Sequence, residues 1–246
     1  MILYIYRIMP RLARSKKIEI NFPTNKSLFK PIHKKNIIIY VLCFNHDTYN
    51  KANNIYSEYY WAKPIIMKYQ DYTFENAIWK QLLEIKDEWI HCEMVGTISW
   101  KANTKVHLNK IENMINNNDM NTNYVNFYDT SNLVLSDKAS AKNHPHLREI
   151  WNFLLDKFQI PDFTESASNY WMCKPIKMLG FINWYLNICL PLLQSHPLIF
   201  EDAKYSNSLN IDNLIQLWGK PYYPHFPFVF ERFHKAFFIH DNLHLN

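Results

Sequence analysis

One apolar run constrains the fold of this chain more than any other feature of its sequence. Residues 37–44 read Ile-Ile-Ile-Tyr-Val-Leu-Cys-Phe, with no charged side chain and no polar alternation. Successive side chains of a strand point to opposite faces, so such a run predicts a strand that is buried on both faces. Strands of this kind belong to parallel sheets with helices on each side. The run therefore predicts an α/β fold.

The patterns that follow alternate between strands and helices, which favours a layered α/β fold with a mainly parallel sheet. Further strands are expected at residues 63–68, 94–99 and 124–128. Helices are expected at residues 51–61, 74–85, 106–116 and 144–158. The apolar segment 178–193 contains Asn183, Asn187 and Pro191, which makes it too short and too polar for a spanning helix. We expect a buried helix there and no membrane span.

Positive charge is concentrated at the beginning of the chain. Residues 1–35 hold nine lysines and arginines and one acidic residue, Glu19, whereas the other 211 residues hold 18 basic and 21 acidic side chains. We expect residues 1–35 to be a loosely ordered basic arm and residues 36–246 to be a single domain. The arm offers cations for the phosphates of a nucleic acid. Short basic tails are usually only solvated, however, so no specific nucleic-acid partner is expected.

The scarcity of glycine and the spacing of cysteine exclude several classes of protein. Three glycines among 246 residues leave no G-x-G-x-x-G fingerprint and no P-loop. The four cysteines form no C-x-x-C pair, which argues against a zinc site. Cys43 and Cys189 lie in apolar runs, so we expect buried free thiols and a reducing, cytoplasmic compartment.

Polar side chains follow the predicted strands at the points where each strand ends. In open α/β sheets the ligand lies at the carboxyl ends of the strands. The candidate ligand-binding residues on this rule are Asn45, His46, Asp47, Asp71, Ser99, Trp100, Lys101 and Asp129.

The C-terminal third contains a second candidate, the pair Glu231 and Arg232, which follows an apolar run. A carboxylate against an apolar wall can have a raised pKa and act as a base. The structural alternative is that Glu231 pairs with a nearby cation and Arg232 binds a carbonyl oxygen.

Several segments, in order along the chain, resemble the glycosyltransferases of bacterial capsule loci and of large DNA viruses. The resemblance covers roughly residues 37–238 and is carried by the first strand and four later motifs. These motifs are Glu75–Lys80, Met94–Lys101, Asn169–Met172 and Pro227–Phe233. The resemblance implies a GT-A-like sheet, related to the Rossmann fold and flanked by helices, with a helical C-terminal part. If the source is viral, the compartment is the host cytoplasm.

The same resemblance implies a reaction and assigns the candidates to it. A sugar would be bound through its nucleoside diphosphate and transferred to a hydroxyl of a glycan or glycoconjugate. Ser99, Trp100 and Lys101 stand where the family has His-Tyr-Arg-Arg, and Glu231 and Arg232 stand on its Glu-Arg. The donor site would comprise Asn45, His46, Asp47, Asp71, Ser99, Trp100, Lys101 and Arg232. The aromatic residues that would hold the acceptor sugar are Tyr170, Trp171, Tyr205 and Trp218.

Two questions about this reaction stay open at the level of sequence. The proton of the acceptor hydroxyl would go to Glu231 or Asp202. No D-x-D motif, which holds a divalent ion in typical GT-A enzymes, occurs in the sequence. The charge of the diphosphate would then be met by Lys101, Lys105 and Arg232. Alternatively, Asp129 and His225 would hold Mn²⁺ or Mg²⁺.

The missing D-x-D and the single cation in the Ser-Trp-Lys segment also favour a second hypothesis. On this hypothesis the chain is a catalytically degenerate GT-A-like module that binds glycans or serves as a scaffold.

Overall fold

The computed structural model describes residues 35–117, 122–128, 144–162, 168–205 and 211–244. Residues 35–246 form one compact unit. Its elements, in chain order, are β1 (Ile37–Cys43), α1 (His46–Tyr56), β2 (Ala62–Ile66), η1 (Phe74–Ala77), α2 (Ile78–Glu84), η2 (Lys86–Glu88), β3 (Met94–Ser99), η3 (Ala102–Thr104), α3 (Leu108–Asn117), β4 (Tyr124–Asn126), α5 (Leu147–Phe158), β5 (Trp171–Cys173), α6 (Pro175–Trp184), η4 (Tyr185–Cys189), α7 (Leu190–Gln194), α8 (Ile211–Trp218), α9 (Phe226–Phe233) and α10 (Lys235–His244).

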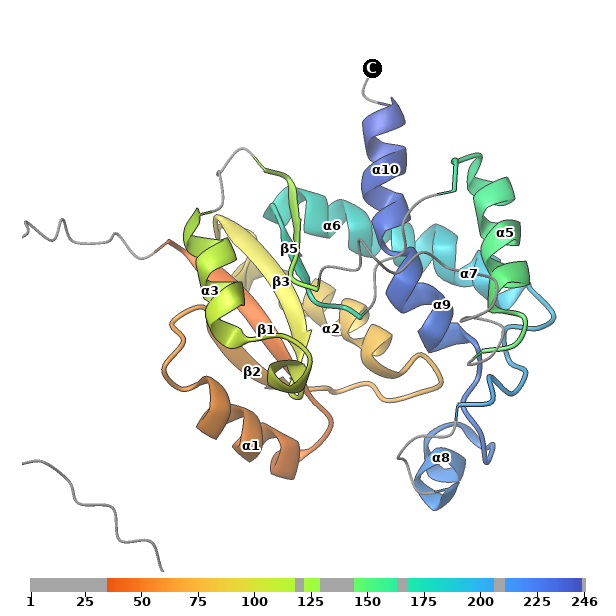
Figure 1. The fold of residues 1–246 in the computed structure, drawn as a ribbon, viewed down its shortest axis with the longest axis horizontal. Helices are drawn as coiled ribbons and strands as arrows, with labels where there is room; N and C mark the ends of the chain where they lie inside the picture. Colours follow the sequence, from red (N-terminus) through yellow and green to blue (C-terminus); the bar gives the residue numbers. More distant parts are fainter. Residues whose placement is uncertain (1–34, 118–121, 129–143, 163–167, 206–210, 245–246) are drawn as a thin grey trace, which may run out of the picture. The chain divides into compact units, whose positions relative to one another are not determined.

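The sheet has five strands in the order β2-β1-β3-β5-β4 (Figure 1). β1 pairs in parallel with β2 and with β3, whereas β5 pairs antiparallel with both β3 and β4. The sheet is therefore mixed, and the expected mainly parallel sheet is correct only for its first half. The strand expected at 94–99 is β3, residue for residue. The pattern gave no strand for Trp171–Cys173, because three residues are too few to show a period.

Helices cover both faces of the sheet, as the unbroken apolar run predicts. Ile39 and Val41 of β1 pack with α1 and α3, and Tyr40 and Leu42 pack on the opposite face with α2, α6 and α9 (Figure 1). All four side chains have no exposed surface. The α/β class predicted from this run is thereby confirmed.

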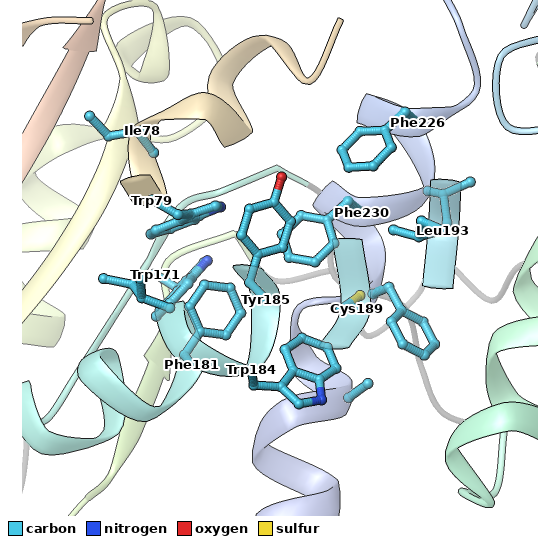
Figure 2. Close-up of a cluster of buried hydrophobic side chains, with 14 of the residues drawn as sticks. Ile78, Trp79, Trp171, Phe181, Trp184, Tyr185, Cys189, Leu193, Phe226 and Phe230 are labelled. Carbon is cyan, nitrogen blue, oxygen red and sulfur yellow. The ribbon is translucent and has the colours of Figure 1, made fainter. Parts of the chain in front are cut away.

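The larger of the two cores is dominated by aromatic rings (Figure 2). Trp79 of α2 stacks on Trp171 of β5 with ring centroids 5.3 Å apart. Phe181 of α6 meets both rings edge-on at 4.9 Å. The ring centroids of Phe230, on α9, and of Tyr185 lie 4.3 Å apart, so α9 is fixed to the same cluster. Rings arranged in this way contribute beyond the area they bury.

The first helix begins earlier than the sequence pattern predicted. The helix was expected at residues 51–61, but α1 starts at His46 because Asn45 caps it. The Asn45 side chain accepts a hydrogen bond from the Thr48 amide at 2.9 Å, and the Thr48 hydroxyl accepts one from the Asn45 amide at 3.0 Å. This reciprocal capping box satisfies two amides that a helix end otherwise leaves unpaired.

The apolar segment expected at 178–193 is one continuous helical run from α6 through η4 to α7. η4 is a π-helical turn. It precedes Pro191, which has no amide hydrogen to donate to the preceding turn. The run Pro175–Gln194 has 20 residues, a mean hydropathy of 1.4 and 39% of its most apolar window buried. Its length and composition would allow it to cross a membrane, a criterion that core helices of soluble proteins also meet.

Gly96 allows β5 to approach β3. A Cβ atom at this position would lie 2.3 Å from the carbonyl oxygen of Trp171 and 2.7 Å from Cβ of Met172. The backbone of β5 cannot move aside as a flexible side chain can. We therefore predict that Gly96→Ala lowers the free energy of unfolding by about 3 kcal/mol or more. Chemical denaturation measures this change.

Gly180→Ala is the matched control, because its added methyl would meet only the end of the Phe237 ring, at 3.2 Å. Alanine is also favoured over glycine within a helix. A Gly96→Ala protein as stable as the wild type would contradict the β3–β5 packing described here.

Candidate functional site

The candidate site lies where the order of the strands reverses. The chain places β2 on one side of β1 and then crosses to place β3 on the other side. In open α/β sheets, ligands bind outside the carboxyl ends of the strands at such a switch point. The ends of β1 and β3 are in register here, with Leu42 opposite Ser99 and the Trp100 amide donating to the Leu42 carbonyl at 3.1 Å.

The outer rim of this crevice joins residues expected from both strand ends. Lys51 of α1 forms an ion pair with Asp47 at 2.7 Å. The same ammonium lies 5.7 Å from the ring centroid of Trp100, and the ammonium of Lys101 lies 4.9 Å from that centroid. Asp47, Trp100 and Lys101 therefore meet at one rim, although they come from different segments. His46 is exposed in the first turn of α1, and Asn45 has a capping role.

Deeper in the crevice, the hydroxyl of Ser99 lies between two titratable groups. It is close enough to the side chains of Glu75 and of Tyr170 to lower the pKa of each. Burial raises the pKa of Glu75, and the nearby charge of Glu231 raises it further. The Ser99 hydroxyl and the charges of Lys105 and Lys101 act in the opposite direction without cancelling the rise. A carboxyl group with a raised pKa in a crevice is suited to proton transfer.

A strained turn places Glu75 in the crevice. The carboxylate of Asp71 accepts a hydrogen bond from the Thr73 amide at 2.8 Å, which closes the turn. Phe74 then has a φ of +52°, which is rare for a bulky side chain. Its ring stacks on that of Tyr223 at 5.0 Å, and this contact holds the conformation. Strain of this kind is concentrated at functional sites. Asp71 thus shapes the site through its turn.

The Asn-Tyr-Trp-Met motif supplies the opposite wall. Lys105 donates a hydrogen bond to the Ser168 hydroxyl at 3.1 Å, and its ammonium lies 5.5 Å from the ring centroid of Tyr170. Asn169 donates to the side-chain oxygen of Asn76 at 2.8 Å, which ties this wall to the helix that follows Glu75.

The C-terminal pair Glu231 and Arg232 also faces this region. Glu231 is close enough for its charge to act on both Glu75 and Tyr170. Its carboxylate forms an ion pair with Arg232 at 2.5 Å, and Arg232 also donates to the Phe228 carbonyl at 2.6 Å. The structure therefore brings together Ser99, Lys101 and Glu231, and places Arg232 in the pairing that the structural alternative described.

Asp202 lies in a different environment. Burial raises its pKa, but the side-chain and backbone hydrogen bonds from Lys204 outweigh this effect and lower it overall. The ammonium of Lys204 is 2.9 Å from the carboxylate. In the described part of the chain, no hydrogen bond or ion pair links Asp202 to Ser99 or Glu75.

The predicted metal ligands do not form a metal site among the described residues. Asp129 lies outside those residues. The His225 side chain has no exposed surface, and neither ring nitrogen has a hydrogen-bond partner within the described ranges. Those ranges also contain no group of three or more histidine, cysteine, aspartate or glutamate side chains that could hold a metal ion. We therefore assign no metal-dependent step.

The four aromatic residues expected to hold the acceptor occupy different environments. Trp171 is fully buried between Trp79 and Phe181, a core position that a sugar does not reach (Figure 2). Tyr170 is 1% exposed and directs its hydroxyl toward Ser99. Tyr205 is 40% exposed. Trp218, on α8, donates to the Tyr222 carbonyl at 2.8 Å.

Tyr205 is the expected aromatic residue that connects with the crevice through other rings. Its ring lies 5.3 Å from that of Tyr223, which in turn stacks on Phe74 beside Glu75.

Sequence reasoning missed Glu75 and Tyr223 as site residues. Glu75 was placed in a predicted helix and in the Glu75–Lys80 motif but was given no role, because its neighbours Phe74, Ala77 and Ile78 fit helical spacing. A usable signal was present in the Asp-Tyr-Thr turn just before it, since such turns often precede functional loops.

No protein-family model, curated protein or solved structure matches this chain. The geometry of the site and the motifs in the sequence are therefore the features that indicate a function.

Buried histidines make the stability of the fold sensitive to acid. Burial lowers the pKa of His144 and of His225 to about 4 and that of His234 to about 3. In the unfolded chain these side chains take up protons near pH 6.5. We predict that the free energy of unfolding keeps its full value above pH 6.5 and declines as the pH falls toward 4. The decline is on the order of 3 kcal/mol per histidine.

His225→Leu tests this prediction, since the variant removes a buried titratable ring that makes no hydrogen bond to a described residue. Its stability should decline less than that of the wild type between pH 6.5 and 4, measured by denaturation at each pH. Parallel pH profiles for the two proteins would refute the assignment for His225.

Proposed function

We propose that this chain is a glycosyltransferase with a GT-A-like fold that moves a hexose or pentose from a nucleotide-sugar donor to a hydroxyl of a glycan or glycoconjugate. The observation that supports it most is the convergence, at the switch point of the sheet, of two lysines with the Ser99 hydroxyl and the carboxyl groups of Glu75 and Glu231. The ordered resemblance of the sequence motifs supports the same reaction.

Lys101 and Lys105 are the groups best placed to meet the charge of a diphosphate. Both act on the inner crevice, and neither forms an ion pair with a described carboxylate. A buried phosphate needs such compensation, because an unpaired charge in a low-dielectric site is prohibitively costly. The amino-terminal end of α1 adds a favourable dipole beside the rim formed by Asp47 and Trp100. The nucleotide would lie against this rim.

In this reaction the acceptor oxygen forms a bond to the anomeric carbon while the bond from that carbon to the diphosphate breaks. The diphosphate leaves with the bonding electron pair, and the lysines stabilise its negative charge. The acceptor hydroxyl gives up its proton to a carboxylate. Tyr205, which is 40% exposed and packs on Tyr223, offers aromatic surface for the acceptor.

The second candidate function is a GT-A-like module that binds or positions glycans without catalysis. It is favoured by the absence of D-x-D from the sequence and by the single cation of the Ser-Trp-Lys segment. Both functions predict a carbohydrate ligand, but only the first predicts a nucleotide.

Nucleotide binding tests the proposal directly. Thermal unfolding should be measured with UDP, GDP and their common sugar conjugates, each with and without Mn²⁺. A ligand at about 100 times its dissociation constant should stabilise the fold by roughly 2.7 kcal/mol. We expect one nucleotide family to produce this shift and its sugar conjugate to be turned over with a glycan acceptor. Absence of a shift with every nucleotide would contradict the proposal and favour the binding module.

Lysine variants locate the nucleotide. Lys101→Gln and Lys105→Gln should each weaken nucleotide binding by roughly 10-fold or more, because each removes a charge-assisted contact with phosphate. Lys157→Gln is the matched control, since Lys157 is an exposed lysine of α5 that also lies over an aromatic ring, that of Phe153. Titration calorimetry gives the affinities. Equal losses in all three variants, or none in the two site variants, would place the nucleotide elsewhere.

A further inference from the structure

We infer that Glu75 is the catalytic group that takes the proton from the acceptor hydroxyl, and that the transfer therefore inverts the anomeric carbon. This inference rests on the proposed function and deepens it, because it assigns the base and the stereochemical outcome. It also replaces the two sequence-based candidates for the base, Glu231 and Asp202, by Glu75, which begins one of the resemblance motifs but was given no role there.

The comparison of the three carboxylates carries the inference. The Asp202 carboxylate accepts from both the amide and the ammonium of Lys204, at 2.8 and 2.9 Å. The Glu231 carboxylate is paired with the guanidinium of Arg232 at 2.5 Å. The carboxylates of Asp202 and Glu231 thus already accept hydrogen bonds from a neighbouring cation, which occupies lone pairs that an acceptor hydroxyl would need.

Glu75 differs from both in its partners. No described lysine or arginine forms an ion pair with it, and the Ser99 hydroxyl lies close enough to lower its pKa. Lys105 and Lys101 act on it only through longer-range charge. Glu75 is buried enough to raise the pKa of its carboxyl group, yet the residue keeps some exposed surface. A group that accepts a proton must combine these two properties.

The position of Glu75 is also fixed more firmly than a surface carboxylate needs. The stacked ring of Phe74 holds the strained backbone just before it. The Asn76–Asn169 hydrogen bond, between two buried side chains, holds the chain just after it. A catalytic base has to be held within a fraction of an ångström of its working position, and these two contacts supply that restraint.

The hydroxyl groups beside Glu75 support its role as an acceptor of protons. The Ser99 hydroxyl lies close to the side chains of Glu75 and Tyr170, and burial raises the pKa of Tyr170, so the Tyr170 hydroxyl keeps its proton. Ser99 is therefore able to donate to the carboxylate, which leaves the other lone pairs of Glu75 for the acceptor hydroxyl. Burial and the charge of Glu231 raise the pKa of Glu75 toward the working range of a base.

The step balances in atoms and charge. The acceptor oxygen forms its bond to the anomeric carbon and loses its proton to a carboxylate oxygen of Glu75. The bond between the anomeric carbon and the diphosphate oxygen breaks, and the nucleoside diphosphate leaves with the electron pair. A single displacement of this kind inverts the configuration, whereas a carboxylate that attacked the carbon itself would lead to retention.

Three isosteric variants separate the carboxylates. Glu75→Gln should bind the donor as the wild type does, by thermal shift, and lose turnover by roughly 100-fold to 10,000-fold. Glu231→Gln and Asp202→Asn should lose less. Glu58→Gln is the matched control, since Glu58 is an exposed glutamate in the turn that follows α1. Glu75→Asp, which keeps a carboxylate, should recover part of the lost turnover.

Two readouts do not depend on the rate. The anomeric configuration of the product, by proton NMR, should be opposite to that of the donor. The side-chain carboxyl carbon of Glu75, followed by carbon-13 NMR in the free protein, should titrate above the ordinary range of glutamate.

The possible failures are distinct. If no nucleotide sugar binds, the proposed function fails and the inference fails with it. If the donor binds and is turned over, but Glu75→Gln is as active as the wild type, the inference alone fails. Retention of configuration, or a glycosyl group covalently attached to Glu75, would also overturn the inference while leaving the transferase in place.

Discussion

The close packing of β5 against β3 at Gly96 is the contact on which the candidate site depends. Without a side chain at this position, the backbone of Trp171 and Met172 lies directly over β3. The residues just before β5 are thereby carried to the carboxyl end of β3. Tyr170 reaches Ser99, Asn169 reaches Asn76, and Lys105 reaches Ser168. One backbone contact thus brings side chains of several segments together at the carboxyl end of β3.

The aromatic core extends this arrangement to the C-terminal helices. Trp171 stacks with Trp79 on one side and with His234 on the other, with ring centroids 5.3 and 5.2 Å apart. Trp79 belongs to the helix that follows Glu75, and His234 is two residues after Arg232. The same buried ring therefore contacts the elements that carry both carboxyl groups of the site. Packing, and not a sequence motif, determines that these groups meet.

The sequence predicted those elements of the structure that show a recognisable pattern of apolar and polar residues. The unbroken apolar run identified β1, its burial on both faces and the α/β class, and the strand-end rule identified Ser99 and Lys101. It could not predict β5, which is too short to show a period, or the antiparallel half of the sheet that β5 begins. It also could not predict Glu75, because the turn that exposes this residue depends on a ring contact with Tyr223, far along the chain. A local sequence pattern does not contain the contacts between residues that lie far apart in the chain.

The central claim is that a nucleotide sugar binds in the crevice between the ends of β1 and β3. The most direct measurement is the chemical shift of the indole N–H of Trp100 in a proton–nitrogen NMR spectrum. A Trp100→Phe variant assigns this signal. The account predicts that the nucleotide that stabilises the protein shifts the Trp100 signal in a saturable way, and leaves that of Trp184, buried in the distant aromatic core, unchanged. A nucleotide that binds without perturbing Trp100, or that perturbs only tryptophans outside this crevice, would contradict it.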